Sequence, residues 1–149
     1  IESKYSPQYT GGGDKGIIDF QRGGKDFRTG AWQGYQGHNF KATVDLKEPT
    51  KVSRLGANFI QDIRSWIWMP KNLKIWTSKD GENWKEVAFI KNEVPFNSYE
   101  ITVSELAINI KKQKVRYVRF EAEYFGIIPD WHLGHGGEAF IFIDELIIE

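Results

Sequence analysis

The alternation of hydrophobic and polar residues predicts β-strands along most of the chain. Residues 40–46 (Phe-Lys-Ala-Thr-Val-Asp-Leu) change between apolar and polar at every step, and residues 118–124 do the same. Because successive side chains of a strand point to opposite faces, both segments are expected to lay one face on a core and the other in water. Further apolar segments, bounded by Gly, Pro, Asn or Asp, raise the expected number of strands to seven or eight: residues 52–60, 73–77, 84–90, 99–103 and 139–148.

The sequence offers little that would form a helix. No segment shows a sustained apolar stripe with a 3.6-residue period, and only residues 104–111 are weakly helical, over about one turn. Between two expected strands, residues 78–83 contain Asp80-Gly81, a dipeptide that accepts the positive φ of a tight hairpin. We therefore predict an all-β fold, in which residues 1–149 form a single-domain antiparallel β-sandwich or jelly roll with loops gathered at its ends.

Three long segments between the expected strands have an unusual composition. Residues 11–39, 61–70 and 125–138 hold four of the six tryptophans and all three histidines. Long loops in a compact domain are usually either functional or disordered, and a high density of aromatic rings argues against disorder. We expect the function of the domain to reside on these loops.

Composition and charge limit the classes of partner. The chain of 149 residues has 20 Lys+Arg against 20 Asp+Glu, so neither nucleic acid nor an anionic membrane is expected as the main partner. The absence of cysteine excludes thiol chemistry and cysteine-ligated zinc. No apolar run approaches the roughly 18 residues of a membrane span. The chain begins at Ile1 without a basic and apolar leader, which we interpret as a processed product or a domain cut from a longer protein.

The loop tryptophans are the main candidates for ligand binding, since six Trp, six Tyr and ten Phe are more than a core of this size requires. An aromatic ring stacked on the apolar face of a sugar, with polar groups holding the hydroxyls, gives affinity without a deep pocket. The residues predicted to bind carbohydrate in this way are Trp66, Trp68, Trp131, His132, Arg64, Asp62, Asp130 and Tyr35. The alternative is that each ring only plugs its loop onto the end of the sandwich.

Other chemistries find little support in the sequence. His132, His135 and Glu138 are each three residues apart but lie among glycines, so the helix of a His-Glu-x-x-His zinc site is not expected. Spacing does not pair two acids as in a glycosidase, and no Gly-x-Ser-x-Gly or phosphate-binding glycine loop is present. The basic residues 111–116 are interpreted as a solvated turn that leads into a strand. We expect no catalytic residues in this domain.

Residues 78–84 (Ser-Lys-Asp-Gly-Glu-Asn-Trp) resemble the hairpin of discoidin domains, which are also called coagulation factor 5/8 type C or galactose-binding-like domains. Other features follow the order of that family: Asp19, Trp32, residues 44–46, Pro70, residues 115–119 and residues 142–146. Three further segments resemble the version of the domain appended to β-N-acetylhexosaminidases of Bacteroides-type bacteria: residues 32–37, residues 59–70 and residues 129–137.

The resemblance implies a noncatalytic module similar to family 32 carbohydrate-binding modules. Its partners would be a glycan of the galactose or N-acetylhexosamine type and the catalytic domain of a parent glycoside hydrolase, placed in the periplasm, on the outer membrane or in secretions. Many members of the family hold one structural calcium ion. Asp19 and Glu145 match the two carboxylate ligands, and backbone carbonyls would complete the site. Two positions depart from the family pattern: Phe20 follows Asp19 where glycine is usual, and Gly30 replaces a threonine.

The resemblance also leaves alternatives open. In one alternative, the domain packs on its parent catalytic domain without binding sugar. In another, it contacts a protein or a membrane, because some members of the family use exposed apolar residues on the same loops for such contacts. Residues 66–69 (Trp-Ile-Trp-Met) would form such a spike here. The neutral charge of the chain disfavours an anionic membrane as the partner, since basic residues would assist that contact.

Overall fold

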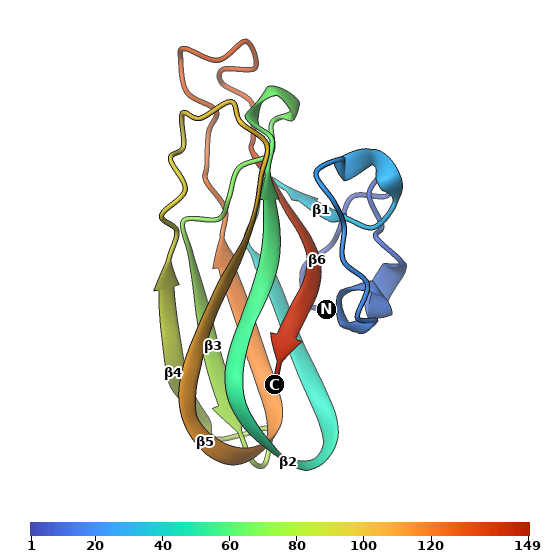
Figure 1. Ribbon diagram of the computed structural model, residues 1–149, viewed down its shortest axis with the longest axis vertical. Coiled ribbons are helices and arrows are strands. Elements are labelled where there is room, and N and C mark those ends of the chain that lie inside the picture. Colours follow the sequence, from blue (N-terminus) through green and yellow to red (C-terminus); the bar gives the residue numbers. More distant parts are fainter.

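The computed structural model describes all 149 residues and consists almost entirely of antiparallel strands (Figure 1). Three short 3₁₀-helices and six strands follow one another along the chain: η1 (Gly13–Ile18), η2 (Phe27–Thr29), β1 (Gln33–Gln36), β2 (Phe40–Gln61), η3 (Ile63–Ser65), β3 (Asn72–Ser78), β4 (Trp84–Lys91), β5 (Thr102–Glu123) and β6 (Phe140–Ile148). The strands are hydrogen-bonded in the order β1-β6-β2-β5-β3-β4. No helix is both long enough and apolar enough to cross a bilayer.

Strands β2 and β5 are long and bent, and each contributes to both layers of a sandwich. The two strands pair along their lengths and fold over together at the lower end of Figure 1. Beyond the bend, residues 55–59 of β2 pair with β6, whereas residues 117–123 of β5 pair with β3. Register shifts between Asp45 and Thr50 and between Val52 and Arg54 mark the bend itself. The predicted all-β sandwich is confirmed, but its two layers are joined by these bent strands.

The bends explain why the structure has fewer strands than the sequence predicts. The expected strands at residues 40–46 and 52–60 are the two halves of β2. The weak helix expected at residues 104–111 is wrong, because this segment is the first half of β5 and pairs with β2. Pairing with a neighbouring strand outweighs a weak local preference for helix. A short strand, β1, also lies within the expected loop 11–39, where it pairs with β6.

The core lies between the two layers and extends under the loops. Its main cluster has 20 buried residues, among them Phe40 and Ala42 from the first half of β2 and Leu55 and Phe59 from the second half. A smaller cluster under the loops at the upper end contains Ile63, Trp68, Ile128 and Ala139. The upper loops therefore have a core of their own, which holds their side chains in place.

The β3–β4 hairpin forms as the sequence predicts. Gly81 has a φ of 80°, in the left-handed region that favours glycine. The Ser78 hydroxyl accepts a hydrogen bond from the Gly81 N–H at 2.8 Å, and the Asp80 carboxylate accepts from the N–H groups of Glu82 and Asn83 at 2.9 and 2.8 Å. Each of these side-chain oxygens accepts a hydrogen bond from a backbone N–H group of the turn that would otherwise bond to water.

Candidate functional site

Three loops meet at the upper end of the sandwich: residues 61–71 with η3, residues 92–101, and residues 124–139 (Figure 1). Buried polar side chains tie them together. The Trp68 indole N–H donates to the Phe96 carbonyl at 2.8 Å, and the Gln61 amide donates to the Pro95 carbonyl at 2.9 Å. The ring of His132 bonds to the Ile63 carbonyl at 2.6 Å. The relative positions of the three loops are thus set by specific contacts.

Four of the residues predicted to bind sugar are buried, Trp68, Tyr35, His132 and Asp62, so their side chains present little surface to a ligand. Trp68 is 1% exposed and stacks on Phe125, with ring centroids 5.0 Å apart. Tyr35 is 0% exposed, and its hydroxyl donates to the Gln33 side chain. His132 is 4% exposed, and its Nδ1 accepts the Gly134 N–H, so Nε2 is the donor to the Ile63 carbonyl. These side chains hold the loops in place, as the plug interpretation expected.

Trp66 is half-buried, and its indole ring packs closely against Gly134 and Gly137. Its φ is 69°, a left-handed conformation that is uncommon outside glycine. A Cβ added to Gly134 would come within 2.5 Å of the indole, and one added to Gly137 within 2.8 Å. Gly134 and Gly137 are therefore explained by the close approach of the Trp66 ring.

An exposed group of rings lies on the same end of the molecule. Trp131 is 47% exposed, Tyr99 46% and Phe96 50%. The Trp131 ring centroid is 6.1 Å from that of Tyr99 and 6.4 Å from that of Phe96. The exposed guanidinium of Arg64 lies over the Tyr99 ring, 5.6 Å from its centroid. We call Arg64, Phe96, Tyr99 and Trp131 the aromatic end surface.

Two members of the aromatic end surface, Phe96 and Tyr99, were not predicted. The pattern of residues 99–103 predicted a strand that begins at Tyr99, but β5 begins at Thr102. The signal in the sequence was the combination of Asn92, Pro95 and Asn97 with two aromatic residues, which is typical of a loop.

The predicted acids of the site differ in their surroundings. Asp130 is exposed next to Trp131. Asp62 is 8% exposed, and burial raises the pKa of its carboxyl, while the positive charges of Arg64 and Arg28 act in the opposite direction. The Asp62 carboxyl is therefore within electrostatic reach of both arginines.

Arg28 lines a recess of about 390 Å³ that the sequence did not predict. Tyr9, Phe27 and Trp32 provide aromatic rings around it. Its volume falls within the range of small-molecule sites. Like the aromatic end surface, this recess combines aromatic rings with an arginine. The two arginines, Arg28 in the recess and Arg64 on the surface, both act to lower the pKa of Asp62.

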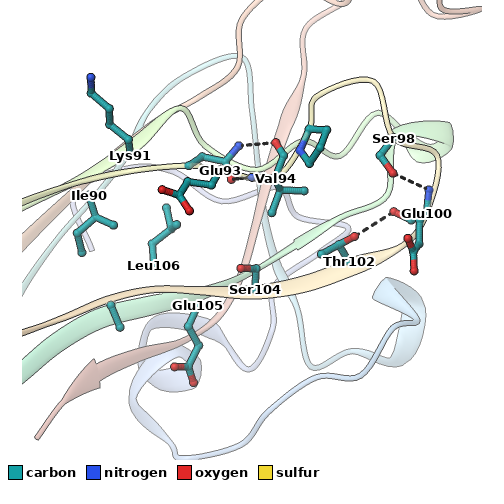
Figure 2. A pocket seen from close by; sticks show the side chains of 13 residues that line it. Ile90, Lys91, Glu93, Val94, Ser98, Glu100, Thr102, Ser104, Glu105 and Leu106 are labelled. Atoms are coloured by element: carbon teal, nitrogen blue, oxygen red, sulfur yellow. Dashed lines mark hydrogen bonds between the residues drawn. The ribbon is translucent and has the colours of Figure 1, made fainter.

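The largest cavity described, of about 610 Å³, lies between residues 90–98 and one edge of β5 (Figure 2). No aromatic ring lines it. Several of its polar groups are already paired with one another: the Asn92 side chain with the backbone of Val94, Ser98 with the Glu100 N–H, and Thr102 with the Glu100 carbonyl. It offers less for sugar recognition than the aromatic end surface does.

The predicted calcium ligands lie close to each other beside β6. Glu145 is 4% exposed, and its carboxylate accepts the Phe20 N–H at 3.1 Å. Burial, together with the negative charges of Asp19 and Asp144, raises the pKa of Glu145 to about 7. No third His, Cys, Asp or Glu joins Asp19 and Glu145 in a cluster, so further ligands would have to be backbone carbonyls.

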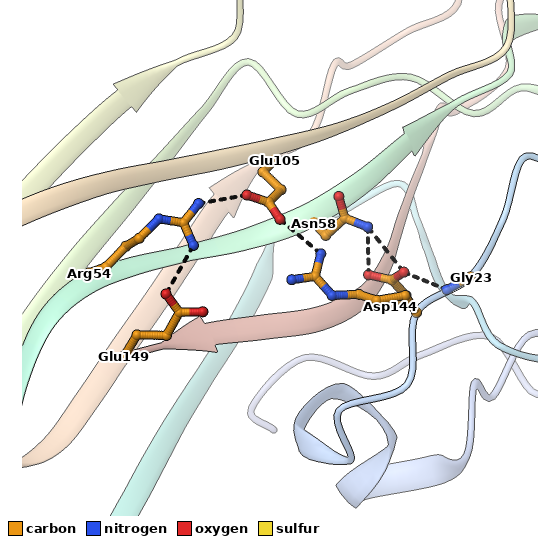
Figure 3. A network of polar contacts seen from close by, with 7 residues as sticks. Gly23, Arg54, Asn58, Glu105, Asp144 and Glu149 are labelled. Carbon is orange, nitrogen blue, oxygen red and sulfur yellow. Dashed lines mark hydrogen bonds and ion pairs between the residues drawn. The ribbon is translucent and has the colours of Figure 1, made fainter.

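The neighbouring Asp144 is not a candidate ligand. Its carboxylate accepts two hydrogen bonds from the Asn58 amide and one from the Gly23 N–H, beside an ion-pair network in which Arg54 bridges Glu105 and Glu149 (Figure 3).

Phe20 has a φ of 63° and a side chain that is 90% exposed. The backbone here thus adopts a left-handed conformation at the position where the resembling family has glycine.

Comparison with known proteins identifies the family. The model of the F5/8 type C domain matches residues 2–136, which is most of the chain. The chain therefore belongs to the F5/8 type C domain family. No curated protein sequence matches it closely enough to count as a relative.

Solved structures with the same fold are carbohydrate-binding modules and related fragments. The CBM32-3 module of a family 31 glycoside hydrolase from Clostridium perfringens is 16% identical, with a TM-score of 0.57 over 99% of this chain and 85% of that one. A fragment of a protein from Bacteroides thetaiotaomicron, provisionally assigned as a chitobiase, is 15% identical, with a TM-score of 0.61 over 93% and 75%. A fucose-binding module from Streptococcus pneumoniae is 18% identical, with a TM-score of 0.53 over 89% and 78%. At these identities the likeness shows the shared fold.

Proposed function

We propose that this domain is a noncatalytic carbohydrate-binding module that binds glycans at the aromatic end surface. The observation that carries the proposal is the group of three exposed rings, held at fixed positions beside an exposed arginine. Rings whose conformation is set in advance lose little entropy on binding, so they suit a shallow sugar site. The similarity in fold to carbohydrate-binding modules supports this use of the loops.

The ligand that we propose is a galactose- or N-acetylhexosamine-type glycan, with the exposed Arg64 and Asp130 as hydrogen-bonding partners beside the rings. A shallow site buries little of a monosaccharide, so the dissociation constant is expected between roughly 10 μM and 1 mM. Attachment to a glycoside hydrolase of the β-hexosaminidase type would make such weak binding useful by raising the local concentration of substrate. The corresponding location is extracytoplasmic.

Calorimetric titration of the chain with galactose, N-acetylgalactosamine and N-acetylglucosamine oligomers tests the proposal. Trp131→Ala and Tyr99→Ala are each expected to weaken binding about tenfold, the effect of losing one stacking contact. Phe89→Ala is the matched control, because Phe89 is an equally exposed ring (46%) that belongs to β4 and not to one of these loops. Unchanged affinity in both loop variants, or no binding of any glycan, would contradict the proposal.

A second function is favoured by a specific observation. Ile127 and Leu133, from the same loop as Trp131, are 57% and 103% exposed. An exposed apolar surface of this kind suits packing on a parent catalytic domain or another protein. Leu133→Ser would then abolish that association, whereas it should leave glycan affinity nearly unchanged if sugar stacks on Trp131 and Tyr99.

We also propose that Asp19 and Glu145 hold one structural calcium ion with backbone carbonyl oxygens. Two neighbouring carboxylates, one with a pKa raised to about 7, form the kind of all-oxygen donor set that calcium prefers. The ion would stabilise the 19–24 loop and perform no chemistry. Thermal unfolding in excess CaCl₂ should show stabilisation of about 2–3 kcal/mol at a hundredfold excess over the dissociation constant. EDTA and Asp19→Asn should each remove this effect, and a melting temperature that does not respond to calcium in the unmodified chain would rule the site out.

A further inference from the structure

The end of the sandwich opposite the aromatic end surface carries a group of unpaired lysines. The bends of β2 and β5 and the β3–β4 hairpin come together there (Figure 1). The basic side chains on these turns are all exposed, and no carboxylate oxygen lies within 4.0 Å of any of them: Lys51, Lys79, Lys111, Lys112 and Lys114. We call these five residues the basic end.

The fold places two of these lysines against each other. Lys51 of β2 and Lys114 of β5 are direct partners in the strand register. Like charges directly opposite one another on neighbouring strands are destabilising. The fold therefore tolerates a repulsion at this end that a bound anion would relieve.

Acids lie on the same turns but do not balance the basic residues: residues 45–52, 77–86 and 109–117 hold eight Lys+Arg against five Asp+Glu, of which Glu48, Glu82 and Glu86 have no ion-pair partner. The Asp45 carboxylate receives two hydrogen bonds from Arg116, at 2.9 and 3.2 Å, and lies 3.8 Å from the Lys47 ammonium. These hydrogen bonds hold the pKa of Asp45 at about 2. The Asp80 carboxylate already accepts hydrogen bonds from the N–H groups of its own turn. An excess of positive charge is left, although the whole chain is neutral.

A cavity lies among these side chains. Lys79, Lys114 and Arg116, with Pro49 and Val115, line a volume of about 150 Å³. Since a water molecule occupies about 30 Å³ of liquid, this space admits one oxyanion group with accompanying water. Cations from strand β5 and from the β3–β4 hairpin thus converge on one small volume.

We propose that the basic end binds an acidic polysaccharide, with a sulfate or carboxylate group seated between Lys79 and Lys114. A membrane is a poorer fit, because a single exposed large hydrophobic residue, Ile108 at 40%, adjoins residues 109–117, and none lies in residues 45–52 or 77–86. A single-stranded nucleic acid would need rings for its bases, and the exposed rings of the domain lie elsewhere. The proposal is independent of glycan binding at the aromatic end surface.

Binding of the full chain to heparin, polygalacturonate, neutral dextran, duplex DNA and phosphatidylserine vesicles at 50 mM NaCl tests the proposal. The triple variant Lys51→Gln, Lys79→Gln, Lys114→Gln removes three cations of the basic end. The matched control is Lys4→Gln, Lys15→Gln, Lys25→Gln, which removes the same charge from exposed, unpaired lysines near the N-terminus. Melting temperatures of both variants verify folding.

The chain is expected to bind heparin or polygalacturonate at least tenfold more tightly than dextran, and the probe that binds identifies sulfate or carboxylate as the preferred group. The triple variant should weaken this binding at least tenfold and reduce the slope of log affinity against log salt by about two to three, while the control changes affinity less than twofold. Trp131→Ala should leave it unchanged. Equal losses in the triple variant and the control, equal or tighter binding of duplex DNA or vesicles, or no binding of either acidic polysaccharide would each overturn the proposal.

Discussion

At the upper end of the sandwich, long loops leave three aromatic rings exposed above a small core of their own, whereas at the lower end tight turns present lysines and no exposed aromatic ring. The loops at the upper end are long enough to bury Ile63, Trp68 and Ile128 between them, and these residues hold the outer rings in place. The turns have no such core, so only flexible charged side chains extend from them. Stacking requires rings set in position beforehand, but attraction between charges over several ångströms does not.

The two kinds of tryptophan at the upper end should respond very differently to truncation. Trp68→Ala is expected to lower the free energy of unfolding by about 3–5 kcal/mol, because it removes a ring that is 1% exposed together with its hydrogen bond to the 92–101 loop. Trp131→Ala should lower it by less than about 1 kcal/mol, because its ring is 47% exposed. Urea unfolding followed by circular dichroism measures both values. Similar losses in the two variants would mean that the upper end does not have a core of its own.

The close packing of Gly134 against the Trp66 indole provides a more local test of how the upper loops are held in place. Gly134→Ala should cost about 1–3 kcal/mol, because its Cβ would lie 2.5 Å from the Trp66 indole. Gly24→Ala is the matched control, since a Cβ there meets nothing within 4 Å. The same unfolding assay applies, and glycan affinity should fall in Gly134→Ala if the shift of Trp66 reaches Trp131. If Gly134→Ala is as stable as Gly24→Ala, the indole does not pack as described.

Ligand binding at the two ends should differ in its dependence on salt concentration. Raising NaCl from 50 to 200 mM is expected to weaken binding of acidic polysaccharide at the basic end by roughly tenfold or more, because binding there releases counterions. Binding of a neutral glycan at the aromatic end surface should change less than twofold. Calorimetry at the two salt concentrations measures both effects, and a steep salt dependence for the neutral glycan would show that charge, and not stacking, governs the upper end.

The smallest expected effect concerns Asp45. Asp45→Asn frees Arg116 and should tighten binding of acidic polysaccharide about twofold to fivefold, a small effect because the ion pair is exposed and screened by solvent. The folded-state pKa of Asp45, about 2, lies below its ordinary value of 3.8, so its contribution to stability is present above pH 4 and is lost as the pH falls towards 2. Acid titration of the melting temperature should therefore be flatter in Asp45→Asn between pH 4 and pH 2. Weaker polysaccharide binding in this variant would place the anion elsewhere.

Much of the architecture could be predicted from local patterns. The alternation in residues 40–46 and 118–124 corresponds to strand segments with one buried face, and Asp80-Gly81 forms the expected hairpin. Family membership was also predictable, because it rests on motifs spread over most of the chain. The strand count was not, since β2 and β5 run through both layers and no local signal reports that two strands are continuous through a bend.

Local sequence patterns are enough to specify a β-sandwich with aromatic residues concentrated in its loops, because strand periodicity and turn chemistry act between close neighbours. Which of the rings face water depends on the folded chain. Trp66 and Trp68 have the same local pattern, yet Trp68 is buried by Phe125 and by the Phe96 carbonyl, which lie 57 and 28 residues further along the chain. The tertiary structure likewise decided that Lys51 lies opposite Lys114, since strand register brings together charges that are 63 residues apart. Burial and charge pairing depend on such distant partners, and a local pattern cannot report them.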